Sequence, residues 1–343
     1  MSEPFGLPLW PFAHGGPCIK GQLKAEPEDF FVDEQLGFEP SGSGDFVWLQ
    51  IEKRGANTDW VAGKIVELAK VKPHEVSYAG KKDRHALTRQ WFSVAIQAKL
   101  EPDWYDLEDA EIKILQISRD EEKLRPGDHQ ANKFLIRLRN IDGDIDGCIK
   151  RLQLIAKMGF PNYFGEQRFG RNNANLSKAQ LWFKQDLNPK RSERGMLLSA
   201  ARSYLFNQVL ARRVDMGNWN QPLTGDLMIT EDSGHSFPIF KLTDEIIKKC
   251  QSMEITPSGP LYGAGEPKAS RNAGSLETDV LKQAVMWIKG LEMQRMRAGR
   301  RELRAKGDGL EWEIDGDDLI MDFQLATGCF ATSLLREIRL VDV

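Results

Sequence analysis

The chain has 343 residues, of which 41% are hydrophobic and 28% charged, as is ordinary for a globular protein of one large or two medium domains. No apolar run approaches the roughly 20 residues of a membrane span, and the N-terminus lacks the basic start and apolar core of an export signal. These patterns argue against a membrane protein and predict a cytoplasmic one. Four widely spaced cysteines and five scattered histidines predict free thiols and no zinc site.

The net charge of −3 conceals an uneven distribution of charge along the chain. Residues 149–213 hold 13 Lys and Arg against 3 Asp and Glu, whereas residues 101–122 hold 9 acidic and 2 basic residues. A local basic excess of this size is typical of a surface that binds phosphates. The two regions could equally attract each other across a domain boundary, and charge alone favours neither interpretation.

Two strand patterns open the chain. Residues 21–36 contain a turn around a proline and then an alternating apolar segment with Phe30 and Val32 on one face. Residues 44–54 alternate in the same way, and we expect this second strand to pair with the first. The residues that share its apolar face are Val47, Leu49 and Ile51.

A helix and three further strands follow. Residues 57–71 predict a helix with Asn57 or Thr58 as N-cap. The segments EVSYAG and QWFSVAI predict two short strands, and the loop between them holds Asp83. Residues 134–141 predict another half-buried strand. A loop held by two strands is a good support for a functional side chain.

The character of the sequence changes near residue 150. From there to about 305 the helical period dominates, as in 198–214, although 217–275 are richer in Gly and Pro and include the strand-like GDLMI. The tail returns to a strand at 319–327 and a short helix through ATSLLREI. A strand-rich, helix-rich, strand-rich order predicts one domain inserted within another.

Several motifs argue against particular cofactors. DGDIDGCIKRLQ (142–153) has the spacing of a calcium loop, but Gln153 replaces the required Glu, so its acids are interpreted as capping a helix. GxGxxG, GxxxxGK[ST], GxSxG and HExxH do not occur, so a nucleotide cofactor is not supported.

The stretch EMQRMRAGRRELRAKG (292–307) predicts a basic helix. Its arginines follow the i, i+3, i+4, i+7 spacing of one helix face, which could match successive RNA phosphates or could be a solvated amphipathic face. Both interpretations remain open. The four residues are Arg297, Arg300, Arg301 and Arg304.

One carboxylate, Asp83, lies among cations in SYAGKKDRHALTRQW (77–91). The neighbouring cations favour its ionised form, which suits nucleophilic attack, removal of a weakly acidic proton or stabilisation of a developing cation. A polar turn with one salt bridge is the simpler interpretation. A metal-dependent nuclease using Asp83 and His85 is a further alternative.

The segment GKKDRHALTRQW (80–91) closely resembles the signature of the TruD family of tRNA pseudouridine synthases. The likeness continues in the family's order along nearly the whole chain. The further segments are GQLKAEPEDFFVDE (21–34), NKF (132–134), GFPNYFGEQRFG (159–170), LSAARSYLFNQ (198–208) and GCFATSLLRE (328–337).

This resemblance implies an α+β fold, in which a pseudouridine synthase catalytic domain with a mixed or antiparallel sheet and flanking helices is interrupted by an inserted α/β TRUD domain. The catalytic domain is expected at residues 1–157 and 304–343, and the insert at 158–303. The resemblance also implies a monomer that acts on tRNA, without a metal, a nucleotide cofactor or a membrane.

The same resemblance implies the site residues. Asp83 is the expected catalytic aspartate. Phe134 is expected to stack on the target uracil, and Phe330 to close the pocket. The expected substrate-binding residues are Lys24, Lys82, Asn132, Phe134 and Phe330, and the arginines expected to bind RNA are Arg168, Arg202, Arg297, Arg300, Arg301 and Arg304.

The implied reaction converts a uridine of tRNA, usually uridine 13 in the D-stem, to pseudouridine. The N1–C1′ bond breaks, the uracil turns and C5 is joined to C1′. Asp83 could attack C1′, attack uracil C6 or remove the ribose 2′ proton. A stacked uridine has to be flipped out first, at a cost of a few kcal/mol. A non-catalytic RNA-binding protein of the same fold is the alternative.

Overall fold

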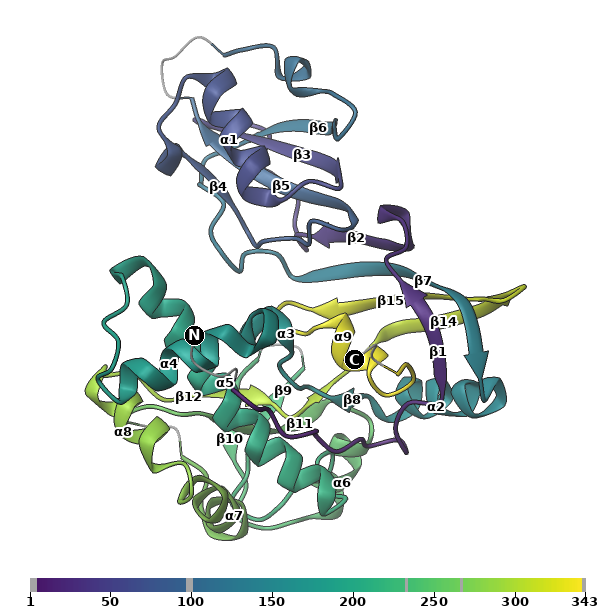
Figure 1. Cartoon of the computed structure of the whole chain (residues 1–343), viewed down its shortest axis with the longest axis vertical. Coiled ribbons are helices and arrows are strands. Elements are labelled where there is room, and N and C mark those ends of the chain that lie inside the picture. Colours follow the sequence, from purple (N-terminus) through teal and green to yellow (C-terminus); the bar gives the residue numbers. More distant parts are fainter. Residues whose placement is uncertain (1–4, 97–100, 232–233, 266–267, 341–343) are drawn as a thin grey trace. The chain divides into compact units, whose positions relative to one another are not determined.

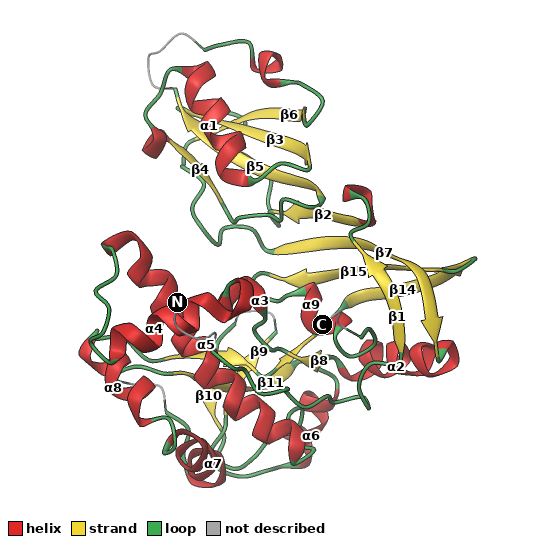
Figure 2. Ribbon diagram, in the orientation of Figure 1, coloured by secondary structure: helices red, strands yellow, loops and turns green. Residues whose placement is uncertain are grey.

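The chain adopts an α+β fold, as expected (Figures 1 and 2). The structure is a computed structural model, and it describes residues 5–96, 101–231, 234–265 and 268–340. Packing divides the chain into two compact units, which are described separately below. Among the described residues, the sheet unit comprises Cys18–Ile145, Gly307–Cys329 and Leu340, and the helical unit comprises residues 5–17, Asp146–Lys306 and Phe330–Arg339.

A mixed sheet of nine strands forms the sheet unit, in the order β14-β15-β7-β2-β5-β3-β6, with β1 beside β7 and β4 beside β5. The pair β2 and β5 is parallel, and the other pairs of this sheet are antiparallel. The strands are β1 (Ile19–Leu23), β2 (Phe30–Gln35), β3 (Phe46–Arg54), β4 (Val76–Tyr78), β5 (Leu87–Ala95), β6 (Ile112–Asp120), β7 (Ala131–Gly143), β14 (Asp308–Asp315) and β15 (Asp318–Ala326).

The C-terminal hairpin completes this sheet. Strand β15 lies along β7 with Phe323 opposite Phe134 and Leu319 opposite Leu138. Residues nearly 190 positions apart in the sequence therefore lie side by side in one sheet. In Figure 1 they are in β15, drawn in yellow, and β7, drawn in teal. The predicted return of the tail to the N-terminal sheet is confirmed at the level of strand pairing.

Helix α1 (Thr58–Ala69) covers one face of β3 and β5 (Figure 1). Asn57 is its N-cap, and its side-chain Oδ1 accepts a hydrogen bond of 2.7 Å from the Trp60 amide. The alternating residues of β3 predicted to share a face lie in the core beneath the helix, because residues two apart in a strand point to the same side. The buried members include Val47, Leu49, Ile51, Val61, Ile65, Phe92 and Val94.

The helical unit contains a four-stranded antiparallel sheet in the order β10-β9-β11-β12 and a short pair of β8 with β13. Its helices are α2 (Ile145–Met158), α3 (Glu166–Phe169), α4 (Ala174–Phe183), α5 (Arg191–Asp215), α6 (Asp244–Gln251), α7 (Arg271–Leu281), α8 (Val285–Met293) and α9 (Ala331–Leu335). Its strands are β8 (Phe160–Pro161), β9 (Leu227–Thr230), β10 (Ser236–Pro238), β11 (Ile255–Leu261), β12 (Gly299–Glu302) and β13 (Arg304–Ala305). The first residue of α2, Ile145, is the last residue of the sheet-unit segment Cys18–Ile145.

Helix α5 is the centre of the helical unit. Its 25 residues carry the face predicted from 198–214, with Leu198, Ala201, Leu205 and Val209 all buried. This face packs into an aromatic-rich core. Long amphipathic helices obtain most of their stability from such packing rather than from intrinsic propensity.

The two compact units do not coincide with the expected domains. Packing changes from one unit to the other at residues 145/146 and 306/307, whereas the expected domain boundaries are 157/158 and 303/304. Residues 5–17 and Phe330–Arg339 also pack with the helical unit. The catalytic and inserted domains, as functional divisions, remain a prediction.

The predicted pairing of residues 21–36 with residues 44–54 is wrong. Strand β5 lies between β2 and β3, with β2 parallel to it and β3 antiparallel. The alternation of apolar residues was predicted correctly, but it identifies the buried face of a strand and not its neighbours in the sheet.

The predicted basic helix at 292–307 is also wrong over most of its length. Helix α8 ends at Met293, and the arginines that follow lie in extended segments, with Arg301 of β12 opposite Gly259 of β11. The segment has no apolar stripe to bury as a helix, so backbone pairing with β11 determines its structure. The four arginines do not share one helix face.

The N-cap of α1 provides a test of the fold. Replacing Asn57 by Ala leaves the Trp60 amide without its acceptor and is expected to lower the free energy of unfolding by about 1 kcal/mol. Asn57→Asp, which keeps an acceptor, is the matched control and is expected to stay close to the unmodified protein. Urea unfolding followed by circular dichroism measures both. Equal stability of Asn57→Ala and the unmodified protein would contradict the capping role.

Candidate active site

The loop of residues 79–86, here called the Asp83 loop, joins the paired strands β4 and β5. Both of its ends are bonded to other segments of the sheet unit. The Gly127 amide donates to Ala79 O at 2.7 Å, and the Gly55 amide donates to Ala86 O at 3.2 Å. The predicted strand–loop–strand arrangement around Asp83 is confirmed.

Two buried polar side chains hold the first half of this loop. Gln90 Nε2 donates to Gly80 O at 3.1 Å, and the Lys82 amide donates to Thr58 Oγ1 at 3.0 Å. Thr58 Oγ1 in turn donates to Gln90 Oε1 at 2.8 Å. Because both side chains are almost fully buried, these bonds are shielded from competing water.

Lys53 holds the second half of the loop. Its Nζ donates to Ala56 O at 2.7 Å and to Asp83 O at 3.1 Å, and the side chain is fully buried. Burial lowers the pKa of Lys53 to about 8; Asp83 opposes this shift, and Lys82 adds to it. We call Lys53, Thr58 and Gln90 the loop anchors.

The Asp83 carboxylate is ion-paired with Lys24. Oδ2 lies 2.6 Å from Lys24 Nζ, and the two side chains are 48% and 24% exposed. Lys24 has φ +60°, an unusual conformation for a residue with a Cβ, and its Nζ lies 4.0 Å from the ring centroid of Phe30. The carboxylate therefore has a fixed counter-charge and still faces solvent, where a substrate can reach it.

The cations next to Asp83 in sequence pair with other acids. Lys81 Nζ lies 2.7 Å from Asp59 Oδ2, and Lys82 Nζ lies 2.7 Å from Glu34 Oε2. The sequence-based idea that its immediate neighbours surround the carboxylate is therefore incorrect for these two lysines. Its ion-pair partner is Lys24, which comes from the end of β1.

Lys82 belongs to a buried polar network. Its side chain is 7% exposed, Glu34 is fully buried, and Lys82 Nζ also donates to Asn132 Oδ1 at 2.6 Å. Burial raises the pKa of Glu34, while the Lys82 charge opposes that shift. Asn132 Nδ2 lies 3.3 Å from His129 Nε2, so Lys82 fixes the orientation of the Asn132 amide.

Phe134 is 7% exposed and lies on β7 between two other aromatic rings of the sheet unit. Its ring stacks on Phe323 with centroids 5.4 Å apart and meets Phe30 edge-on at 6.0 Å. The Lys24 ammonium lies over the ring of Phe30, so the Asp83 ion pair contacts this cluster of aromatic rings. Stacking of Phe134 on uracil remains a prediction.

Phe330 belongs to the helical unit, at the N-cap of α9. Its ring packs against Phe164 at 5.9 Å, and the Arg301 guanidinium lies 4.1 Å from the Phe164 centroid. Arg168 lies 5.4 Å from the same Phe164 ring. Two guanidinium groups therefore share one aromatic ring, and closure of the pocket by Phe330 remains a prediction.

The predicted RNA-binding arginines differ in exposure. The Arg300 side chain is 3% exposed and paired with Glu277 at 2.7 Å, and Arg304 is buried with Nη2 donating to Cys250 O at 2.7 Å. These two arginines hold the helical unit together, so the geometric reason for expecting them to bind RNA is absent. Arg297, in contrast, is exposed.

Arg202 and Arg168 occupy intermediate positions. Arg202 Nη2 donates to Leu261 O at 2.9 Å and Arg297 O at 3.0 Å, and Arg168 Nη1 donates to Ser199 Oγ at 2.8 Å. Burial lowers the pKa of both guanidinium groups, and no described carboxylate offsets that shift. A site of this kind favours an anion.

Sequence reasoning missed several residues of the sheet-unit site. Glu34 occupies the inward position that follows Phe30 and Val32, and Lys53 occupies the inward position after the apolar alternation of β3. A charged residue at the next inward position of a strand is a signal of a buried polar site. His129 and Thr58 offered no comparable signal.

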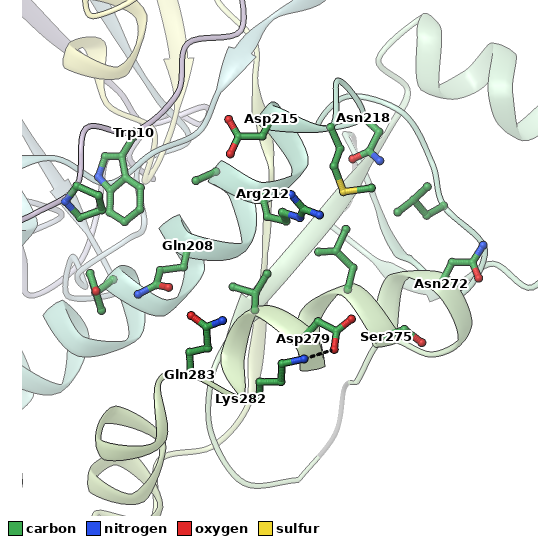
Figure 3. Close-up of a pocket in the computed structure, with 17 residues that line it drawn as sticks. Trp10, Gln208, Arg212, Asp215, Asn218, Asn272, Ser275, Asp279, Lys282 and Gln283 are labelled. Atoms are coloured by element: carbon green, nitrogen blue, oxygen red, sulfur yellow. Dashed lines mark hydrogen bonds and ion pairs between the residues drawn. The ribbon is translucent and has the colours of Figure 1, made fainter.

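A pocket of about 890 Å³ opens in the helical unit beside α5 and α7 (Figure 3). Arg212 and Asp215 come from α5, Asp279 comes from α7, and Asp279 pairs with Lys282 at 2.8 Å. Its charges have both signs and favour no particular ligand. Pocket volume therefore does not identify the functional site.

The described residues contain no group of three or more His, Cys, Asp or Glu side chains arranged to hold a metal ion. Of the acids of the predicted calcium-like segment, Asp146 lies in the first turn of α2 and Asp142 lies in β7, and the capping interpretation stays a prediction. Within the same described ranges, no helix combines the length and apolar character that a membrane crossing needs.

This fold also occurs among solved structures. A crystal structure from Methanosarcina mazei, which carries the provisional name tRNA pseudouridine synthase D (TruD), matches 97% of this chain and 96% of that chain, with a TM-score of 0.68 and 23% identity. The chain therefore shares the α+β fold of that structure.

The sequence comparisons define the family. The family model described as tRNA pseudouridine synthase D (TruD) matches residues 10–179 and 188–338. Proteins named tRNA pseudouridine synthase D from Methylococcus capsulatus and Nitrosococcus oceani are each 43% identical, covering 96% and 95% of this chain and 93% of each relative. The relative from Pseudomonas aeruginosa is 41% identical over 96% of this chain and 93% of its own length. The chain belongs to the TruD family.

His129 provides a test of the buried network. Burial lowers its pKa to about 4, and the Lys82 charge acts in the same direction, whereas an unfolded histidine has a pKa of about 6.5. Between these values the unfolded chain binds the proton and the folded chain does not, so stability rises with pH and falls on acidification. In the His129→Gln variant, the number of protons taken up on unfolding near pH 5 is expected to fall by about one.

The measurement is the pH dependence of the unfolding free energy from pH 4 to 7, compared between the two proteins. Identical slopes would show that the imidazole titrates alike in the folded and unfolded chains, which would contradict its burial in the network.

Proposed function

We propose that this chain isomerises uridine to pseudouridine in tRNA, with uridine 13 of the D-stem as its target. Asp83 is the proposed catalytic carboxylate. The observation that carries this proposal is the Lys24–Asp83 pair, in which a solvent-accessible carboxylate is held 2.6 Å from an ammonium on an anchored loop. Membership of the TruD family supplies the reaction.

The reaction needs an anionic group at its first chemical step. The Asp83 carboxylate, ion-paired with Lys24, is competent for attack at C1′, attack at uracil C6 or removal of the 2′ proton. In each route the N1–C1′ bond breaks, C5 is joined to C1′, C5 loses a proton and N1 gains one. The isomerisation balances without a co-substrate.

The remaining groups of the sheet unit are proposed to receive the flipped uracil. Lys82 positions Asn132, whose amide can donate to or accept from the base edge, and Phe134 supplies an apolar surface. Within the sheet unit we propose Lys24, Lys82, Asn132 and Phe134 as substrate-binding residues, with Lys82 acting through Asn132. Phe330, in the helical unit, is a separate proposal as a substrate-binding residue. The cost of unstacking the uridine is a few kcal/mol and is offset by contacts elsewhere on the tRNA.

We propose that the helical unit supplies those contacts. Arg168 and Arg301 lie against the Phe164 ring, and for Arg168 and Arg202 no described carboxylate competes for the guanidinium. Arg297 adds an exposed cation. Arg300 and Arg304 are assigned to packing rather than to RNA. We also propose a cytoplasmic monomer.

The catalytic assignment predicts the behaviour of Asp83→Asn. Loss of the carboxylate is expected to abolish pseudouridine formation, whereas tRNA affinity is expected to stay within about tenfold because the phosphate contacts are unchanged. Carbodiimide-stop mapping of modified tRNA and filter binding measure the two quantities. The control is Asp59→Asn, an exposed acid that pairs with Lys81 of the same loop and is expected to stay active.

Near-normal turnover of Asp83→Asn would refute the assignment. Unmodified tRNA bound tightly by the unaltered protein would instead favour the alternative of a non-catalytic RNA-binding protein.

If the basic stretch 149–213 of the helical unit contacts tRNA phosphates, its exposed cations should contribute to the salt dependence of tRNA binding. Arg171, Lys184 and Arg191 are exposed and have no ion pair among the described residues. Each phosphate contact contributes about 0.7 to 0.9 to the slope of log K against log salt, so replacing all three by Ala should make the slope shallower by roughly 2 to 3. Lys282→Ala is the control, because that ammonium pairs with Asp279. An unchanged slope would show that these three side chains are solvated and do not contact tRNA phosphates.

A further inference from the structure

Lys53 is a charged residue in a position where an apolar one is expected. It follows Val47, Leu49 and Ile51 on the inward face of β3, and all four side chains are fully buried. Its strand neighbours are Thr88 of β5 and Ile112 of β6. Burying an ammonium costs free energy, which an ion pair with a carboxylate usually offsets.

No carboxylate forms an ion pair with Lys53 in the part of the chain that the structure describes. Its Nζ bonds instead to two main-chain carbonyls, Ala56 O at 2.7 Å and Asp83 O at 3.1 Å. An apolar side chain of similar length would fill this place at lower cost. The position of the charge thus calls for an explanation beyond packing.

We propose that Lys53 is a positioning residue for the Asp83 carboxylate: it fixes the main chain of Asp83 from the buried side and places a positive charge there. This inference rests on the proposed catalytic role of Asp83. Lys24 pairs with the carboxylate from its exposed side, and Lys53 bonds the carbonyl of the same residue from the buried side. Charged donors make the stronger hydrogen bonds, and fixed charges in a buried site are more effective than in water.

The ionisation of Lys53 gives this role a signature that simple packing lacks. The charged groups that face its Nζ are Asp83, which raises its pKa, and Lys82, which lowers it. Burial outweighs both and brings the pKa to about 8. As pH rises through this value the ammonium loses its proton, so the bond to Asp83 O weakens and the charge disappears. The isomerisation rate is then expected to fall.

The test compares Lys53→Met and Lys53→Arg with the unmodified protein. Single-turnover rates of pseudouridine formation are measured from pH 6.5 to 9.5, with tRNA affinity measured in parallel. Lys53→Met is expected to lose about 10- to 100-fold in rate at pH 7, with affinity within threefold, because displacement of a reacting group is costly. Lys81→Met, an exposed change in the same loop, is the control and should keep its rate.

The pH profiles separate positioning from general destabilisation. The unmodified protein is expected to lose rate above about pH 8, Lys53→Met to lack that limb, and Lys53→Arg to shift it upward because a guanidinium stays protonated. A normal rate for Lys53→Met would overturn the proposal. If both variants fail to fold, a flat profile of the unmodified protein between pH 7.5 and 8.5 would overturn it.

Asp83→Asn assayed alongside distinguishes the two proposals. If Asp83→Asn is inactive and Lys53→Met is normal, the positioning role fails and the catalytic role stands. If Asp83→Asn is active, the catalytic role itself fails.

Discussion

The site depends on the hydrogen bonds that fix the main chain of the Asp83 loop to buried polar side chains at the edge of a hydrophobic core. A carboxylate that is about half exposed can act at a defined place only if its backbone is held. Lys53, Thr58 and Gln90 supply that restraint from β3, α1 and β5, the three elements that share the core beneath α1. The packing of apolar residues therefore controls the geometry of a polar site.

The charges around this loop are separated into two layers. The outer layer pairs Asp83 with Lys24 in contact with solvent, and the inner layer pairs Lys82 with Glu34 out of contact with it. Lys82, the lysine next to Asp83 in sequence, is therefore paired with Glu34 and orients Asn132 through a hydrogen bond. The outer layer is left to meet the substrate, while the inner layer gives it a rigid support. In the helical unit, Arg300 and Arg304 are likewise used for packing, and the guanidinium groups that lack carboxylate partners lie elsewhere.

The sequence predicted much of the local structure, because local structure follows from periodicity. The alternation in β2 and β3, the helical face of α5 and the loop around Asp83 were all predicted correctly. Strand order was not, because β2 and β3 show equally good apolar faces and nothing in either indicates that β5 lies between them. The arginine-rich segment was taken for a helix because its spacing fits one, whereas pairing with β11 determines its structure. The ion pair of Lys24 with Asp83 joins residues 59 positions apart, and the spacing of charges along the sequence does not predict it.

The central claim is that the Asp83 loop is held in place before tRNA binds. The most direct measurement is amide hydrogen exchange at Lys82 in the free protein, resolved by NMR and compared with Thr58→Val. The account predicts slow exchange at Lys82 in the unmodified protein, because this amide donates to the buried Thr58 Oγ1, and much faster exchange in the variant with the amides of α1 unchanged. Exchange at Lys82 as fast as in an unstructured loop, in the unmodified protein, would contradict the account.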